Sequence, residues 1–177
     1  MNYQTISDMV AAADKVREKL KATVENLTTE EADALPEGEK WSIANIVEHI
    51  SMVDGGGGKI CARLLSKAGD APSDGRARIS PEFLEKAMAS AGAKLEAPEM
   101  VHPKAGKSIA ESLAAMEEND KIFAELIPIL ESKDDSAAKF PHPYFGDLTA
   151  TEWYAIKIAH VARHTRQIGN LLEKIRS

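Results

Sequence analysis

Apolar residues recur at intervals of three and four along four long stretches of the chain. This spacing places the apolar side chains on one face of an α-helix and the charged ones on the other. No stretch shows the alternation expected of a β-strand. The sequence therefore predicts an all-α fold, a four-helix bundle whose apolar faces pack together. The four predicted helices run from Thr5 to Leu27, from Ser42 to about Lys67, from Ser108 to Leu130 and from about Ala150 to the end of the chain.

Capping residues sharpen the limits of these elements. Thr149 followed by Glu152 has the spacing of a capping box, in which the two side chains satisfy free backbone amides at a helix start. In the long connection between the second and third helices, Ser80 as N-cap and Pro81 in the first turn predict a short extra helix that Gly92 closes. This crossover connection completes the predicted bundle.

A run of glycines, Gly55 to Gly58, lies inside the second predicted helix. Each glycine in a helix costs roughly 1 kcal/mol relative to alanine, so the run should loosen or break the helix unless the lack of side chains serves a purpose. The missing side chains could let another backbone or a ligand approach closely, or the run could form a tolerated soft joint. The sequence leaves both purposes open.

The inward stripe of the last predicted helix is interrupted by polar residues. Buried polar groups cost free energy unless they find partners, so a stripe that only filled a core would carry leucine or isoleucine at its centre. His160 and His164 have Cβ atoms roughly 5–6 Å apart on one helical face and can bind one metal ion. Taken alone, they could also be hydrogen-bonded core or surface histidines. The stripe reads Trp153, Ile156, His160, His164, Gln167, Leu171 and Ile175.

Two residues on other helices could join this pair. His49 stands beside the apolar stripe of the second helix, bordered by Glu48. A single histidine of this kind is more often a satisfied core or boundary residue, but beside the paired histidines it becomes the natural third ligand. Asp120 is the polar member of the third helix's seam. Its carboxylate could orient a metal ligand, point into a pocket or meet solvent.

Several motifs, taken in chain order, resemble the DinB-like superfamily. They are Trp41-Ser42-Ile43 with His49 seven residues after Ser42, His-Pro-Tyr-Phe-Gly-Asp-Leu-Thr at 142–149, Glu152-Trp153, and His160-x-x-Arg163-His164-x-x-Gln167-Ile168. The resemblance covers nearly the whole chain and is specific in its last third. It implies a four-helix bundle, often homodimeric, with a three-histidine metal site. By resemblance, the ligands here are His49, His160 and His164.

The resemblance also implies a chemistry. Members include divalent-metal-dependent thiol transferases that use low-molecular-weight thiols and a maleylpyruvate isomerase that depends on mycothiol. We therefore expect a metal-dependent transferase or hydrolase that acts on a small molecule, which can carry a thiol. Three imidazoles suit zinc or nickel, and also iron, and leave an open coordination position. The alternative is a non-catalytic, stress-related helical bundle that binds a metal or ligand.

Four further polar residues could support the predicted ligands, and two more histidines lie in loops. Gln167 and Asp120 could orient ligands or substrate, while Arg163 could pair with Glu48 to position the second helix or form a solvated salt bridge. His102 and His142 each precede a proline in a loop, and neither is included in the predicted ligand set. His142 belongs to the motif that resembles the family and is expected to help position the last helix.

Composition and charge limit which partners and which cell compartment we expect for the protein. The chain of 177 residues suits one domain, 1–177, and its net charge of −6 comes without a cluster of lysine and arginine, so a nucleic-acid partner is not expected. The N-terminus lacks the features of a signal peptide, and no apolar run approaches the length of a membrane span. A lone cysteine, Cys61, fits a reducing compartment. We expect a cytoplasmic protein with no membrane partner.

Overall fold

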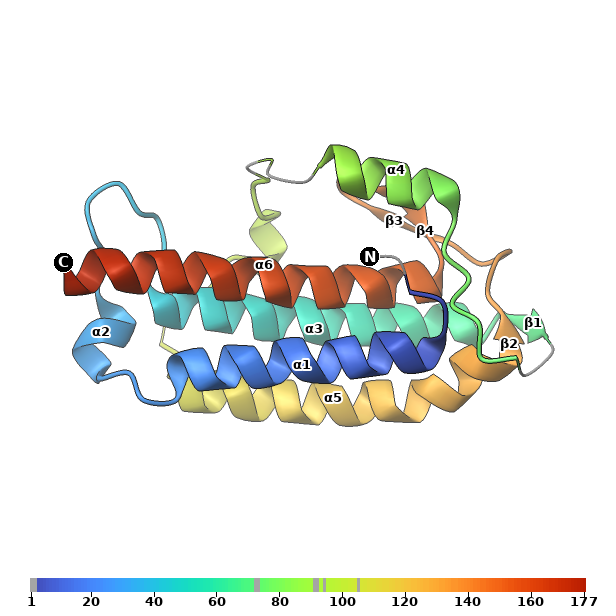
Figure 1. The fold of residues 1–177 in the computed structure, drawn as a ribbon, viewed down its shortest axis with the longest axis horizontal. Helices are drawn as coiled ribbons and strands as arrows, with labels where there is room; N and C mark the ends of the chain where they lie inside the picture. Colours follow the sequence, from blue (N-terminus) through green and yellow to red (C-terminus); the bar gives the residue numbers. More distant parts are fainter. Residues whose placement is uncertain (1–2, 72–73, 91–92, 94, 105) are drawn as a thin grey trace.

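Four long helices lie side by side along the longest axis of the molecule (Figure 1). The structure is a computed structural model that describes residues 3–71, 74–90, 93, 95–104 and 106–177. In the bundle α3 packs against both α5 and α6, and α1 packs against α5 and α6. The predicted four-helix bundle is confirmed. Its helices are α1 (Ile6–Val24), α3 (Ile43–Leu65), α5 (Ile109–Ser132) and α6 (Ala150–Arg176).

Capping boxes start all four long helices. At the start of α6, Thr149 Oγ1 accepts from the backbone amide of Glu152, and the Glu152 carboxylate accepts from the amide of Thr149 at 3.0 Å. These two reciprocal bonds satisfy backbone amides at the helix start that have no hydrogen-bond partner inside the helix. The capping box predicted from the sequence is therefore present. The N-caps of the other three long helices are Thr5, Ser42 and Ser108.

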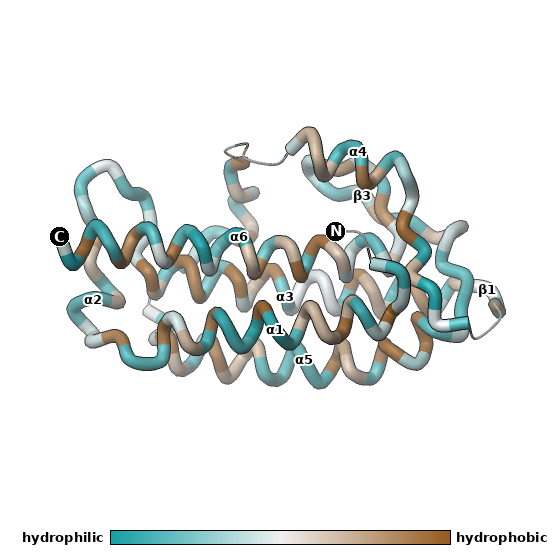
Figure 2. Tube along the Cα trace, in the orientation of Figure 1, coloured by the Kyte–Doolittle hydropathy of each residue, from teal (hydrophilic) through white to brown (hydrophobic). Residues whose placement is uncertain are grey.

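The core of the bundle is divided into two apolar clusters. Apolar and polar positions are interspersed along each long helix, as the predicted spacing of three and four requires (Figure 2). One cluster includes Met9, Leu64 and Leu126. The other includes Leu20 and Ile50. Between them each helix contributes one charged residue instead of an apolar one; these are Arg17, Asp54, Asp120 and Lys157, and we call them the ion cluster.

The glycine run does not break its helix, and the close approach of a neighbouring segment, one of the two purposes left open by the sequence, is found at Gly55. The α3 helix continues through all four glycines to Leu65. A Cβ atom on Gly55 would lie 3.3 Å from Asn119 Oδ1, and one on Gly58 would lie 3.5 Å from Ile122 Cγ2. Both neighbours belong to α5. At Gly55 the missing side chain therefore lets α5 approach α3 closely, whereas a Cβ on Gly58 would make an ordinary van der Waals contact.

Two short antiparallel ladders depart from the prediction of no strands. β1 (Gly69–Asp70) pairs with β2 (Lys133–Asp134), and β3 (Phe140–His142) pairs with β4 (Gly146–Leu148). Gly146 has a φ of +80°, which suits glycine at the turn of the β3–β4 hairpin. Strands of two or three residues are too short to leave an alternating pattern in the sequence.

The connection between α3 and α5 carries the predicted extra helix. This helix is α4 (Pro81–Ala89), capped by Ser80; the predicted stop, Gly92, lies outside the described residues. A 3₁₀ turn, η1 (Glu99–Val101), follows and contacts α3. A further short helix, α2 (Thr29–Asp33), links α1 to α3. In the described part of the chain, none of the helices combines the length and apolarity that a membrane span needs.

Candidate metal centre

Three imidazoles from two helices converge at one point of the bundle. His49 comes from α3, and His160 and His164 come from consecutive turns of α6; their potential ligand atoms lie within 4.8 Å of one another. The Nε2 atoms of His49 and His160 are 3.1 Å apart. Two nitrogens bound to one zinc ion at about 2.0–2.1 Å would be about 3.3 Å apart in tetrahedral geometry. The donor set therefore fits a metal ion, and we call these residues the histidine centre.

Hydrogen bonds to two of the rings decide which nitrogen atoms face the centre. His49 Nδ1 lies 2.7 Å from the carbonyl oxygen of Val101, and His164 Nδ1 lies 2.8 Å from Gln167 Oε1. Both oxygens only accept, so each Nδ1 donates its hydrogen and leaves a lone pair on Nε2. Metal-bound histidines commonly use their second nitrogen in this way. The buried Nδ1 of His160 has no partner among the described residues.

The environment keeps these imidazoles uncharged. Burial lowers the pKa of His164 to about 3 and lowers the pKa of His49, and it places the pKa of His160 well below its usual value. The positive charge of Arg163 lowers all three further. A neutral imidazole is the form that binds a metal ion. Near neutral pH the centre therefore presents unprotonated nitrogens without competition from bound protons.

Aromatic rings and the η1 segment form a wall beside His49. The ring of Trp41 lies 4.9 Å from that of His49 and 5.8 Å from that of His102. His102 Nε2 is 2.9 Å from the carbonyl oxygen of Ala97, which holds the segment folded back on itself. Because Val101 supplies the oxygen that binds His49, this segment both covers the centre and orients one of its rings. Sequence spacing gave no sign of this backbone partner.

His142 lies in the β3–β4 hairpin and is not part of the histidine centre. Its ring is 5.0 Å from that of Trp153 and 4.8 Å from that of Phe145, while its Nδ1 accepts from the amide of Tyr144. Burial lowers the pKa of His142 to about 4. The residue thus packs the hairpin against the first turns of α6.

The structure does not bring every candidate residue to the histidine centre. Asp120 is instead a member of the ion cluster, where it accepts from Arg17 and Lys157. The expected pairing of Arg163 with Glu48 is not formed among the described residues. Adjacent positions on a helix do not share a face, so Glu48 turns away from its neighbour His49 and accepts from the amide of Lys104 at 3.3 Å. Arg163 donates to His164 Nε2 at 2.9 Å.

The ion cluster was missed by sequence reasoning, apart from Asp120. Arg17 bridges Asp54 and Asp120, with its Nε 2.9 Å from Asp120 Oδ2, and Lys157 Nζ lies 2.8 Å from Asp120 Oδ1. Burial raises the pKa of Asp54, whereas the bonds from Arg17 and Lys157 lower the pKa of Asp120 despite its burial. The polar position in the α5 seam was the signal that such partners exist.

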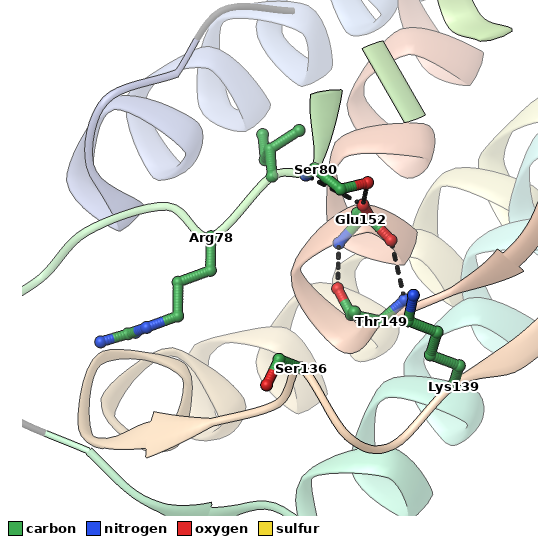
Figure 3. A pocket seen from close by; sticks show the side chains of 7 residues that line it. Arg78, Ser80, Ser136, Lys139, Thr149 and Glu152 are labelled. Atoms are coloured by element: carbon green, nitrogen blue, oxygen red, sulfur yellow. Dashed lines mark hydrogen bonds between the residues drawn. The ribbon is translucent and has the colours of Figure 1, made fainter. Parts of the chain in front are cut away.

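Two cavities lie away from the histidines. One, of about 260 Å³, opens at the start of α6 (Figure 3). There Glu152 also accepts from the amide of Ser80 at 3.1 Å, so its carboxylate ties the N-cap of α4 to the first turn of α6. The residues that line this larger cavity are Arg78, Ile79, Ser80, Ser136, Lys139, Thr149 and Glu152. A smaller cavity, of about 110 Å³, lies beside the ion cluster.

Comparison with known proteins places this arrangement in a family. The family model of the DinB superfamily matches residues 12–168, a span that includes all three histidines. The chain belongs to the DinB superfamily. This DinB protein is 27% identical to the uncharacterized Bacillus subtilis protein YuaE over 154 residues, which cover 86% of this chain and 90% of that protein.

A solved structure supports the fold of this DinB protein. The structure described as TT2238, a four-helix bundle protein, superposes with a TM-score of 0.60, covering 93% of this chain and 98% of that one. The two sequences are 18% identical, so the likeness concerns the fold alone. It agrees with the bundle of α1, α3, α5 and α6.

Proposed function

We propose that this DinB protein binds a divalent metal ion through Nε2 of His49, His160 and His164. The observation that carries the proposal is their convergence within 4.8 Å, with the Nδ1 hydrogens of two rings already used elsewhere. An all-nitrogen donor set suits zinc, nickel or iron. Three protein ligands leave at least one coordination position for water or a small molecule.

We propose further that the bound molecule is small and can carry a thiol, and that the protein is a metal-dependent transferase or hydrolase. A divalent ion held here would lower the pKa of a bound water or thiol and polarise a neighbouring electrophile. The chain itself supplies orientation: Val101 and Gln167 fix two of the rings. Trp41 packs on His49 and keeps water from that side. Membership in the DinB superfamily supports this reading.

A second candidate function is metal or ligand binding without turnover. The η1 segment favours it, because Val101 bonds directly to His49 and covers that side of the centre. The two candidates differ in whether a small molecule reaches the metal and reacts. An assay that joins a low-molecular-weight thiol to 1-chloro-2,4-dinitrobenzene separates them. Turnover that requires metal and disappears in His49→Ala supports the enzyme, while binding without turnover supports the second candidate.

Elemental analysis of protein purified without a His-tag tests the metal site itself. We expect about one metal ion per wild-type chain and its loss in His49→Ala. The matched control is His142→Ala, because His142 is a histidine of the β3–β4 hairpin that lies outside the histidine centre. That variant should keep its metal. Equal metal content in wild type and His49→Ala would remove His49 from the site, and metal-free wild type would overturn the proposal.

A further inference from the structure

The side chain of Arg163 lies directly on one of the proposed metal ligands. Its Nη2 donates to Nε2 of His164 at 2.9 Å. Neighbouring residues on an α-helix point about 100° apart, so the guanidinium reaches this ring only by bending along the helix surface. Arg163 is partly buried there. A long and flexible cation is therefore held at the histidine centre by one bond to an imidazole.

This bond uses the lone pair that a metal ion would need. The other nitrogen of His164, Nδ1, is engaged with Gln167 Oε1. A neutral imidazole has a single lone pair, and a guanidinium has no acceptor to offer in exchange. Metal binding at His164 and the bond from Arg163 are therefore mutually exclusive. Loading the site must move the Arg163 side chain away from the ring.

Among the described residues, no carboxylate belongs to the histidine centre. The hydrogen-bond partners of its rings are the carbonyl oxygen of Val101, Gln167, Arg163 and one another, so Arg163 is the charged group in contact with the centre. Glu48, the acidic neighbour of His49 in sequence, faces the amide of Lys104. A divalent cation beside a guanidinium would leave uncompensated positive charge in a partly buried site. Such a site favours an anionic ligand.

We propose that Arg163 is the displaceable anion-binding residue of this centre: its guanidinium leaves His164 when the metal binds and then holds a carboxylate of the bound small molecule. The planar guanidinium matches a carboxylate with two parallel hydrogen bonds, which a point charge cannot do. The proposal rests on the metal-binding function above and names the substrate class, small carboxylates that can also carry a thiol. Gln167 keeps the His164 ring in place during the exchange.

Zinc titration against a competing chelating dye tests the displacement. Removing a charge-assisted bond that competes with the metal should let Arg163→Gln bind Zn²⁺ about tenfold tighter than wild type. Arg163→Lys keeps the positive charge and should stay close to wild type. Arg166→Gln is the matched control, because Arg166 is an exposed arginine on the same helix, and its Zn²⁺ affinity should not change. Unchanged affinity in Arg163→Gln would overturn the displacement.

A pair of thiol probes tests the carboxylate role without any turnover. Mercaptoacetate and 2-mercaptoethanol share a thiol, but only the first has a carboxylate. Their binding to Co²⁺-loaded protein is followed by the visible spectrum. We expect wild type to prefer mercaptoacetate about tenfold, since a bidentate charged pair contributes on that scale. Arg163→Gln should lose the preference and bind 2-mercaptoethanol as before, and Arg163→Lys should keep part of it.

The outcomes separate this proposal from the metal site on which it rests. If Arg163→Gln loads with Co²⁺ and still prefers mercaptoacetate, the carboxylate role is overturned while the metal site stands. If wild type binds neither Zn²⁺ nor Co²⁺, the proposed function fails and this proposal fails with it. Circular dichroism checks that each variant is folded. Should Arg163→Gln not fold, Arg163→Lys replaces it in the thiol-probe test, because lysine cannot form two parallel hydrogen bonds to a carboxylate. If Arg163→Lys prefers mercaptoacetate as strongly as wild type does, the carboxylate role is overturned.

Discussion

Two polar groups interrupt the apolar core of the bundle, and they are satisfied in opposite ways. In the ion cluster each charge meets its opposite, as when Arg17 bridges Asp54 and Asp120 and Lys157 also binds Asp120. In the histidine centre like groups face each other, and the ring centroids of His160 and His164 are 4.4 Å apart. One group pairs its charges within the chain, with only Asp54 Oδ1 left unpartnered among the described atoms of its four side chains, whereas the other converges ring nitrogens on a common point.

This difference in pairing separates a structural polar group from a candidate binding site better than the positions of the cavities do. Both cavities described above lie away from the histidines, and the smaller one borders the ion cluster. Buried ion pairs need each other, because desolvating a charge is costly. The Nε2 atoms of His49 and His160 instead meet without an opposite charge between them, an arrangement that could hold a metal ion. Substitutions should therefore affect stability at one group and ligand binding at the other.

The largest expected effect is on stability, in Arg17→Met. This change leaves Asp54 and Asp120 without their shared arginine, and Asp54 has a fully buried side chain. Removing one partner of a buried ion pair costs about 3–5 kcal/mol. We expect a loss of that size in urea unfolding of the metal-free protein, with zinc affinity unchanged.

Lys21→Met is the control for Arg17→Met. Lys21 lies one turn further along α1 and pairs with Glu117 at 3.8 Å in an exposed position. An exposed ion pair contributes little, so this variant should change stability by less than about 0.5 kcal/mol. Similar losses in both variants would show that the ion cluster is not the buried structural element described here.

The next effect is on metal affinity, in Gln167→Ala. Gln167 is exposed, yet its Oε1 accepts from the His164 ring and sets which nitrogen faces the centre. Losing such an orienting partner weakens metal binding about 10–100-fold. The expected change has the opposite sign to that of Arg163→Gln, although both residues bond the same ring. The control is Asn170→Ala, because Asn170 is exposed on α6 one turn after Gln167. If Gln167→Ala bound Zn²⁺ as tightly as wild type does, the prediction would be contradicted.

The helices and the paired histidines could be predicted because their signals are local. His160 and His164 lie four residues apart on one helix, and capping residues mark the start of that helix. The contribution of His49 depends on the register between α3 and α6, which spacing within one helix cannot fix. Resemblance to the DinB-like superfamily supplied that link. The structure brings the three together.

Other features depend on contacts between segments that are distant in the sequence, and the sequence could not predict them. The partners of Asp120 come from α1 and α6, and the sequence of its own helix, α5, does not indicate which residues they are. The ligand-orienting atom of Val101 is a backbone oxygen, which every residue carries. The continuous path of α3 through Gly55 to Gly58 is fixed by packing against α5, because tertiary contacts override helix propensity.

A smaller effect separates two of these glycines. A Cβ on Gly56 would meet no heavy atom within 4 Å, so Gly56→Ala should stabilise the protein by about 0.5–1 kcal/mol through helix propensity. On Gly55 it would lie 3.3 Å from Asn119 Oδ1, and Asn119 also donates to the carbonyl of Ser51 at 3.1 Å. Gly55→Ala should therefore gain less, or lose stability, beside the ion cluster. Thermal unfolding measures both, and equal gains would contradict the close packing.

The smallest effect at neutral pH appears only on acidification, at His142. Burial lowers its pKa to about 4, against 6.5 for an ordinary histidine. Between these values the unfolded chain binds a proton that the folded chain does not, so the free energy of unfolding decreases as the pH falls from 6.5 to 4. Above pH 6.5 this contribution is constant. His142→Gln should therefore show a shallower decline of its urea midpoint over that interval than wild type does.

The ring protons of His142 give a direct check by nuclear magnetic resonance. In the folded protein their shift should titrate near pH 4. A midpoint near 6.5, the ordinary value, would mean that the hairpin leaves the ring open to water. In that case the packing of His142 on Trp153 could not be what excludes the proton. Acid should therefore loosen the hairpin end of α6, where the folded protein holds the His142 ring uncharged against Trp153.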